Sequence, residues 1–378
     1  MAVTSRTAFM HKFAAALLSN DEAAVSPVSA YLCLSLVLLG ATKETGTHSQ
    51  MCELFGIDPE NEDEFLLACA DMLAKFQTTQ PNVEFLTANS LWGNGIKQAY
   101  LDVCATKLRA DARPLSNKAA INAWVAEKTK NNIREILTVD PEGPLVCTNA
   151  TYYKGQWTYK FDPAKTEDVP FYSHFPESIP AVDCRMMEMT TKLLYAQHGS
   201  MQIVQLPYGP AAEANPFVAY VLLPGREDTL KSTLQYFVQD VNVWDEIVDS
   251  LTLEDVNLRI PKFHIETNES VRDALQALGM SDAFGPSASF ARISDDPGVF
   301  LEDVLTAVMI EVDEAGTEAA AATAAVFATR GSKGPRKDEP IHMKCNRPFV
   351  FLLVHQSTRA LLFAATVKNP GAVKSRGE

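Results

Sequence analysis

The residue types that most often carry catalysis or bind metals are scattered through this sequence. Its seven histidines are dispersed, and it contains no GxSxG, no HExxH and no glycine-rich phosphate loop. No CxxC and no Cys/His spacing suited to a metal occurs among the seven cysteines, which are Cys33, Cys52, Cys69, Cys104, Cys147, Cys184 and Cys345. We therefore expect no enzyme active site, no metal and no cofactor. We expect reduced, buried thiols, which favour a reducing compartment.

One segment is unusual for a chain rich in large apolar residues. Residues 314–331 read EAGTEAAAATAAVFATRG, and a polar, turn-rich stretch, RGSKGPRKDEP, occupies residues 330–340. Alanine favours helix, but the run has no stripe of large residues with which a helix could dock. A disordered linker is a second interpretation, favoured by the Gly, Ser, Lys and Pro content that follows.

A third interpretation treats the alanine-rich run as a β-strand. With a period of two, one face would carry Thr317, Ala319, Ala321, Thr323, Ala325 and Phe327, and the other Glu318, Ala320, Ala322, Ala324, Val326 and Ala328. The first face suits burial over a core, and the second directs its single charge to solvent. Small side chains would let the strand enter between two strands already in place, because bulky or charged ones would clash or be desolvated. Such a loop is a bistable element.

The elements that must position this segment change in type along the chain. Residues 9–137 are mostly helical in pattern, with an amphipathic helix through Phe9, Phe13 and Leu17 and predicted helices at residues 31–40 and 121–137. Strands rich in β-branched and aromatic residues are predicted at residues 145–161, 201–208, 217–225, 256–265, 304–312 and 348–355. This order predicts an α+β protein with a single domain over residues 1–378.

The composition disfavours several classes of partner. Of the 378 residues 47% are hydrophobic, and 33 Lys and Arg against 47 Asp and Glu give a formal net charge of -14. Such a charge disfavours binding to nucleic acid or to an anionic membrane. No apolar run reaches the roughly 18 residues of a membrane helix, and the N-terminus shows no evident signal peptide. We expect a cytoplasmic protein, or a secreted one without a visible signal.

A series of motifs, in order, makes the chain resemble the serpins along essentially its whole length. The most specific is EAGTEAAA from Glu314, which is similar to the serpin hinge. The others are SPVSAYLCLSLVLLGATKET from residue 26, INAWVAEKT from 121, TNATYYKGQW from 148, RIPKFHIE from 259, and NRPFVFLLVH from 346 with a closing Asn369-Pro370. The resemblance implies the serpin fold, with helices, three β-sheets and an exposed reactive-centre loop over residues 314–347. The hinge it implies comprises Glu314, Gly316, Thr317, Ala319, Ala320, Ala321, Ala322 and Thr323.

The resemblance also implies a metastable suicide inhibitor of proteases. In this family a protease cleaves the loop and is trapped as an acyl-enzyme when the loop inserts as a new central strand. The scissile bond usually follows the seventeenth residue counted from the hinge glutamate, which implies the bond Arg330-Gly331. Arginine suits a trypsin-like serine protease, whose pocket carries a carboxylate, while a cysteine protease stays open as a target. We expect subsite contacts from Phe327, Ala328, Thr329 and Ser332, with Lys333, Arg336 and Lys337 as alternative bait residues in a loop longer than usual.

Two further sites match the family residue by residue. The shutter, a polar cluster under the sheet that must open, corresponds to Ser26, Pro27, Ser29, Asn149 and Thr306, and the breach, where insertion starts, corresponds to Trp157. The alternatives are a helix N-cap at Ser26 followed by Pro27, and an ordinary core tryptophan. Asn149 also lies in a glycosylation sequon, as does Asn268, but we favour a buried role for Asn149. Thr306 stands where serpins commonly show histidine, so a titratable partner is lost although a hydroxyl remains.

A non-inhibitory serpin, acting as a chaperone, carrier or storage protein, is the alternative function. Such members tend to carry bulky, charged or proline residues where this chain has Ala319 to Ala322, so inhibition is favoured. Activation by heparin is not indicated, because residues 60–75, ENEDEFLLACADMLAK, are mostly acidic where a cofactor site could lie. We expect a monomer whose partner is its target protease, held in a covalent acyl complex.

Overall fold

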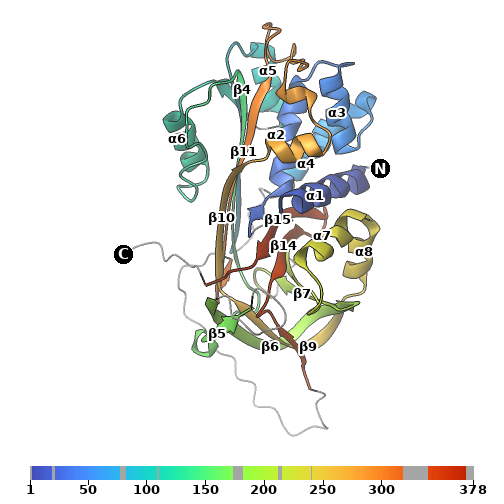
Figure 1. Cartoon of the computed structure of the whole chain (residues 1–378), viewed down its shortest axis with the longest axis vertical. Coiled ribbons are helices and arrows are strands. Elements are labelled where there is room, and N and C mark those ends of the chain that lie inside the picture. The colour runs from blue at the N-terminus through green and yellow to red at the C-terminus, as the bar shows by residue number, and fades with distance from the viewer. Residues whose placement is uncertain are drawn as a thin grey trace.

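Long vertical strands form the centre of the molecule in Figure 1, with α6 on one side and α1 to α4 on the other. The structure is a computed structural model, and it describes residues 2–18, 22–76, 82–108, 110–172, 182–211, 215–239, 241–317 and 339–371. The described α-helices are α1 (Ala2–Leu18), α2 (Pro27–Gly40), α3 (Gly46–Phe55), α4 (Glu62–Phe76), α5 (Gln98–Val103), α6 (Lys118–Lys128), α7 (Leu230–Gln239), α8 (Val241–Asp249) and α9 (Arg272–Ala277).

The described strands form two hydrogen-bonded sheets. The six-stranded sheet has the order β10-β11-β12-β4-β2-β3, and these strands are β10 (Phe263–Ser270), β11 (Leu301–Val312), β12 (Gly316–Thr317), β4 (Leu145–Gln156), β2 (Val83–Gly93) and β3 (Asp111–Pro114). The nine-stranded sheet contains β1 (Ala24–Val25), β15 (Ala360–Val367), β14 (Phe349–His355), β8 (Phe217–Leu223), β7 (Met201–Pro207), β6 (Val182–His198), β9 (Thr252–Pro261), β13 (Ile341–Lys344) and β5 (Glu167–Phe171).

This architecture confirms the predicted α+β class, with one difference in the number of sheets. Three sheets were implied, whereas hydrogen bonding joins the described strands into two. The reason is the length of β6, which spans 17 residues. One part of β6 pairs with β9 from Met186 to Tyr195, and its end pairs with β7 from Leu194 to His198, so a single strand bridges two groups of strands.

The predicted helix over residues 121–137 was wrong in its second half. α6 ends at Lys128, and Lys130 and Asn131 follow with positive φ angles of 52° and 63°, which a continuing helix does not allow. The apolar residues Ile133, Ile136 and Leu137 beyond this turn are still buried, and Asn122 Oδ1 accepts from the backbone N–H groups of Ile136 and Leu137, both at 3.0 Å. Their spacing therefore reflects burial against a sheet rather than a helical face.

The mostly helical pattern expected over residues 9–137 was also incomplete. The eleven-residue strand β2 lies between α4 and α5 and pairs with β4 from Val83 to Gly93. In the same way, the predicted strand at residues 256–265 is two strands, β9 and β10, which Lys262 separates. The remaining predicted strands are confirmed, with ends that differ by a few residues.

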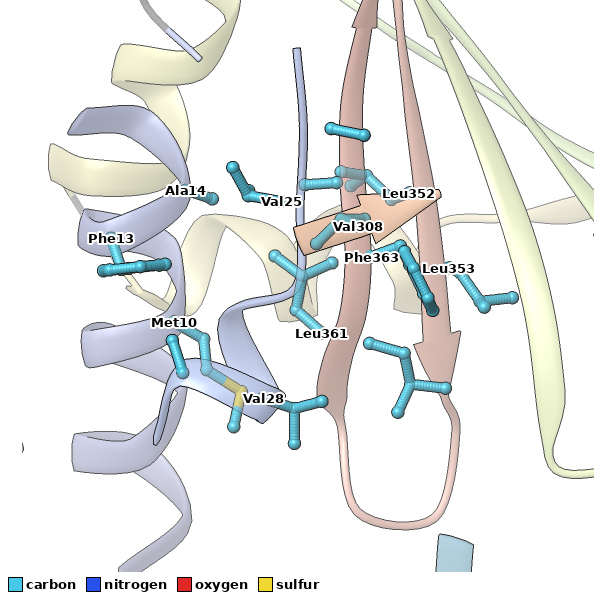
Figure 2. Packing of buried hydrophobic residues seen from close by; sticks show 14 of the residues in the cluster. Met10, Phe13, Ala14, Val25, Val28, Val308, Leu352, Leu353, Leu361 and Phe363 are labelled. Atoms are coloured by element: carbon cyan, nitrogen blue, oxygen red, sulfur yellow. The ribbon is translucent and has the colours of Figure 1, made fainter. Parts of the chain in front are cut away.

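Helices α1 and α2 pack on β15 and form part of the main core. Every residue of α2 is buried, and Phe9 and Phe13 of α1 are 1% exposed, so both predicted helices are confirmed. Figure 2 shows Met10 of α1, Val28 of α2 and Leu361 of β15 pointing toward one another. All seven cysteines lie in the described part of the chain, where they are buried and form no disulfide, as expected.

A second, smaller core lies under α6. Its buried members include Ile121 and Trp124 of α6, Ala150 and Tyr152 of β4, and Met309 of β11. α6 packs on β2, where the rings of Trp124 and Trp92 lie 5.7 Å apart, and the small core continues from there across β4 to β11. Any separation of those two strands must disturb this small core.

Candidate functional site: the hinge and the seam between β4 and β11

β4 and β11 are parallel neighbours for most of their length, and we call the line between them the seam. The pairing runs from Leu301 opposite Leu145 to Met309 opposite Tyr152. Beyond this point the strands diverge, and β12 lies between them. Thr317 of β12 is opposite Val312 of β11 and Gly155 of β4, and both pairings are antiparallel. The first residues of the expected hinge therefore occupy one end of the seam.

A tight turn leads the chain from β11 into β12. The carboxylate of Asp313 accepts from the backbone N–H groups of Ala315 and Gly316 at 2.8 Å and 3.0 Å, and the Asp313 N–H donates to the Gly316 carbonyl. A Cβ atom on Gly316 would lie 2.0 Å from the carbonyl oxygen of Gly155. Glycine is required here because the backbones of β12 and β4 approach too closely for any side chain. Burial raises the pKa of the Asp313 carboxyl, against hydrogen bonds that lower it.

An ion pair fixes the start of the hinge. Glu314 Oε2 lies 2.7 Å from Lys262 Nζ, and Thr166 Oγ1 donates to Glu314 Oε1 at 2.8 Å. The Glu314 carbonyl also accepts from the N–H of Phe161 at 2.9 Å. Burial alone would raise the pKa of Glu314, but hydrogen bonds from Lys262, the backbone and Thr166 outweigh it, so the pKa is lowered. Glu314 is thus held as a carboxylate between Lys262, which joins β9 to β10, and Thr166, which precedes β5.

Trp157, the expected breach residue, contacts the hinge directly. Its indole Nε1 donates to the Asp313 carbonyl at 3.0 Å, and its backbone N–H donates to the Ala315 carbonyl at 3.0 Å. The indole stacks on Tyr208 with ring centroids 4.4 Å apart. The Tyr208 hydroxyl in turn lies 2.6 Å from the Thr317 hydroxyl. Trp157 is therefore a buried residue that also orders the entry to the seam.

The expected shutter residues Ser29, Asn149 and Thr306 form one hydrogen-bonded cluster beneath the seam. Asn149 is 1% exposed, as the expected buried role requires, and its amide donates to Ser29 Oγ and to Asn89 Oδ1. Its Oδ1 accepts from Thr306 Oγ1 at 3.1 Å, directly across the seam. Thr87 extends the cluster, since its hydroxyl lies 2.6 Å from Ser29 Oγ. One side-chain hydrogen bond thus links β4 to β11 at mid-strand.

Ser26 and Pro27 lie at the start of α2, outside this cluster. Ser26 occupies the N-cap position and Pro27 the first turn, but the Ser26 hydroxyl makes no cap bond. It donates instead to the Leu362 carbonyl of β15 at 2.7 Å. The N-cap interpretation was therefore right about position and wrong about the hydrogen bond.

The expected reactive-centre loop over residues 314–347 was too long at its C-terminal end, because residues 341–344 form β13, which pairs with β9 in the nine-stranded sheet. Residues 318–338 lie outside the described residues. The hinge residues Ala319, Ala320, Ala321, Ala322 and Thr323, the subsite residues Phe327, Ala328, Thr329 and Ser332, the bond Arg330-Gly331, and the alternative baits Lys333, Arg336 and Lys337 all lie between residues 318 and 338. They remain predictions.

Several residues of the site were missed from the sequence. Lys262 stands inside the motif RIPKFHIE, but nothing there marks it as the partner of a glutamate 52 positions later. Tyr208, Thr166, Thr87 and Asn89 were also missed, because their contacts with the hinge and shutter depend on strand pairing. Over the described residues no cluster of three or more His, Cys, Asp or Glu could hold a metal ion. None of the described helices is long and apolar enough to cross a membrane.

Comparisons with known proteins identify the class of this fold. The profile described as Serpin (serine protease inhibitor) matches residues 4–370. Serpin-ZXA of Oryza sativa subsp. japonica is 29% identical over 398 residues and covers 98% of both chains. A serpin-like protein of Methanosarcina acetivorans, itself uncharacterized, is 30% identical over 365 residues, with 93% of this chain and 82% of that one covered. The chain belongs to the serpin family.

Solved structures agree on the fold. The complex of human thyroxine-binding globulin superposes with a TM-score of 0.83 at 22% identity, covering 98% of this chain and 100% of that one. Tengpin, a thermophilic serpin in the native state, gives a TM-score of 0.83 at 24% identity, covering 97% and 94%. The serpin fold expected from the sequence is confirmed.

Proposed function

We propose that this protein is a suicide inhibitor of trypsin-like serine proteases, cleaved after Arg330. One observation carries the proposal: β12 lies in the seam, in antiparallel register with both neighbours. The family description as serine protease inhibitor supports it. Residues 1–378 would then act as one inhibitory domain, with the target protease as the partner.

The register of β12 predicts how far insertion extends. Because Thr317 is opposite Gly155 and Val312, a strand continued in register would place residue 323 opposite Asn149 and Thr306. Residue 327 would then face Leu145, the first residue of β4. The run from 317 to 327 thus matches the remaining length of the seam, and Arg330 would lie just beyond its end.

The same register assigns faces to the inserted strand. The Thr317 side chain is fully buried, so residues 319, 321, 323, 325 and 327 would point to the same core, as period two requires. These are mainly alanine and threonine. The hydroxyl of Thr323 would enter between Thr306 and Asn149 and could bond to both, which replaces the direct hydrogen bond now present across the seam.

The chemistry uses the protease's own acylation step. The serine oxygen of the protease bonds to the carbonyl carbon of Arg330, the Arg330-Gly331 amide breaks, and Gly331 leaves with a new amino group. If insertion is faster than hydrolysis of the ester, the protease is carried along the sheet. Fourteen residues at about 3.3 Å each give a path on the order of 46 Å.

Arg330 suits a protease whose specificity pocket carries a carboxylate, because guanidinium and carboxylate form paired, charge-assisted hydrogen bonds. Thr329 and Ala328 are small and leave the protease cleft open. Cysteine proteases also form acyl intermediates and are a secondary target class.

Incubation with trypsin at near-equal concentration, followed by denaturing electrophoresis and mass spectrometry, tests the proposal. We expect a denaturant-resistant complex and a released peptide that begins at Gly331. A peptide that begins later would move the bait to Lys333, Arg336 or Lys337. Complete cleavage without a complex would overturn inhibition and favour a non-inhibitory serpin. Arg330→Ala should abolish the trypsin complex, while Arg134→Ala, which removes an exposed arginine about 200 residues from Arg330, serves as the matched control.

A further inference from the structure

Glu269 of β10 is a half-buried carboxyl group that the described residues leave poorly satisfied. Its Oε1 atom is buried and has no hydrogen-bond partner. β10 and β11 are antiparallel neighbours, side by side in Figure 1, and Glu269 is directly opposite Thr306. Residues that face each other in such a pair have Cβ atoms about 5 Å apart and point to the same side of the sheet.

That side is the core side, where the shutter lies. Thr267, two residues earlier on β10, accepts there from the backbone N–H of Ala24 in β1. Thr306 is 2% exposed and donates from the same face to Asn149. Glu269, Thr306 and Asn149 therefore form a lateral row of polar side chains across three adjacent strands.

The single hydroxyl proton of Thr306 can serve only one acceptor at a time. In the closed seam it is donated to Asn149 Oδ1, since the Asn149 amide is already used by Ser29 and Asn89. Toward Glu269 the Thr306 oxygen then presents lone pairs only. An ionised Glu269 is also an acceptor, so it competes with Asn149 for this proton, whereas a protonated Glu269 can donate to Thr306 instead.

We propose that Glu269 is a positioning residue for loop insertion: its ionised carboxylate weakens the Thr306–Asn149 hydrogen bond and so promotes opening of the seam. The inference rests on the proposed function, whose inserting strand must pass between these two residues. Protonation of Glu269 would reverse the effect and hold the seam closed.

The surroundings of Glu269 support this role. Burial raises the pKa of Glu269, and no charged neighbour among the described residues offsets it. The charged groups near β10 have other partners. The Asp303 carboxylate accepts from Ser270 Oγ, and the Arg272 guanidinium donates to the carbonyls of Glu302 and Phe284. The Glu302 carboxylate accepts from the N–H groups of Glu142 and Gly143, and the Glu22 carboxylate accepts from those of Lys368 and Asn369. Glu266 points to the opposite face of β10 and is exposed.

Glu269→Gln in the full chain tests the inference, because an amide can donate to Thr306 and carries no charge. Glu266→Gln removes a charge from the same strand on the exposed face and is the matched control. Two readouts are needed: urea unfolding from about pH 4.3, the ordinary pKa of glutamate, to about pH 7.5, and the rate at which a synthetic peptide with the sequence of residues 317–330 anneals into the sheet.

A carboxyl group with a raised pKa stabilises the fold at low pH and loses that contribution as pH rises through the pKa. We therefore expect wild type to lose stability with rising pH relative to Glu269→Gln, and the control to follow wild type. Near pH 7.5 the Gln variant should anneal peptide about fivefold more slowly, and this difference should shrink as the pH falls toward the ordinary glutamate pKa of about 4.3.

The role of Glu269 would be overturned if wild type and Glu269→Gln changed stability with pH in parallel, or if they annealed peptide at equal rates near pH 7.5. A wild type that takes up no peptide would also overturn it. The proposed function is tested by a different result. If wild type anneals peptide but forms no complex with trypsin, the protein is not an inhibitor of trypsin, and the difference in annealing rate between wild type and Glu269→Gln still tests the role of Glu269.

Discussion

Lys262 Nζ lies 2.7 Å from Glu314 Oε2, and this ion pair joins the residue between β9 and β10 to the first residue of the hinge. The Glu314 side chain is 12% exposed and that of Lys262 is 30% exposed. The pair is therefore partly shielded from water, and its loss should be felt more than that of a surface ion pair.

Charge reversal at Glu314 should weaken the native fold. Glu314→Lys places two cations together and removes the acceptor for Thr166, and we expect a loss of about 1–2 kcal/mol in the free energy of unfolding. Lys262→Glu combined with Glu314→Lys should recover part of that loss. A double-mutant cycle by urea unfolding gives the coupling, and a coupling energy near zero would contradict the pairing.

Gly316 should tolerate no side chain. Gly316→Val would force a Cβ atom to within 2.0 Å of the Gly155 carbonyl, so β12 should leave the seam and insertion should become inefficient. We expect more inhibitor molecules to be cleaved per trypsin molecule trapped. Gly285→Ala is the control, because a Cβ atom there would meet nothing within 4 Å. Equal stoichiometry for the two variants would show that β12 does not guide insertion.

Thr323 should matter only after cleavage. The register places it between Thr306 and Asn149 in the inserted strand, so Thr323→Val would bury both polar groups without a partner there. We expect the intact protein to keep its stability and the cleaved form to lose about 1–3 kcal/mol. Thr329→Val, beyond the end of the seam, should change neither form. If Thr323→Val lowered the stability of the intact protein, Thr323 would already make stabilising contacts before cleavage, which would contradict this expectation.

His355 should make the fold sensitive to acid. Burial, with smaller contributions from the charges of Lys75 and Arg6, lowers the pKa of His355 to about 4. The native state holds this histidine neutral, with Nδ1 2.7 Å from Thr358 Oγ1, whereas the unfolded chain protonates it near pH 6.5. Stability from this group is therefore complete above about pH 6.5 and is lost as pH falls through about 4.

Urea unfolding of His355→Gln against pH checks this expectation. The variant should show a smaller loss of stability between about pH 6.5 and pH 4 than wild type. His342→Gln removes an exposed histidine and should keep the wild-type slope. If His355→Gln and wild type lose stability in parallel, another group is responsible for the acid sensitivity.

The sequence predicted those parts of the fold and site that depend on local pattern. α2 was predicted because a continuous run of apolar residues is typical of a helix that is buried on all sides, and the burial of Thr317 was predicted because alternation in a strand fixes side-chain direction. The partners across strands could not be predicted. Lys262 meets Glu314, and Glu269 meets Thr306, only because β10 and β11 pair in one particular register. The end of α6 at Lys128 was missed because the residues after it keep a helix-like spacing while packing against the sheet.

Thermal unfolding of the chain cleaved after Arg330 tests most directly whether the loop enters the seam. We predict a melting temperature well above that of the intact protein, because the inserted strand adds two ladders of backbone hydrogen bonds to the six-stranded sheet. Ala321→Arg, which places a charge on the core face, should abolish the increase. A cleaved wild type that melts at or below the temperature of the intact protein would contradict insertion, and with it the proposed mechanism.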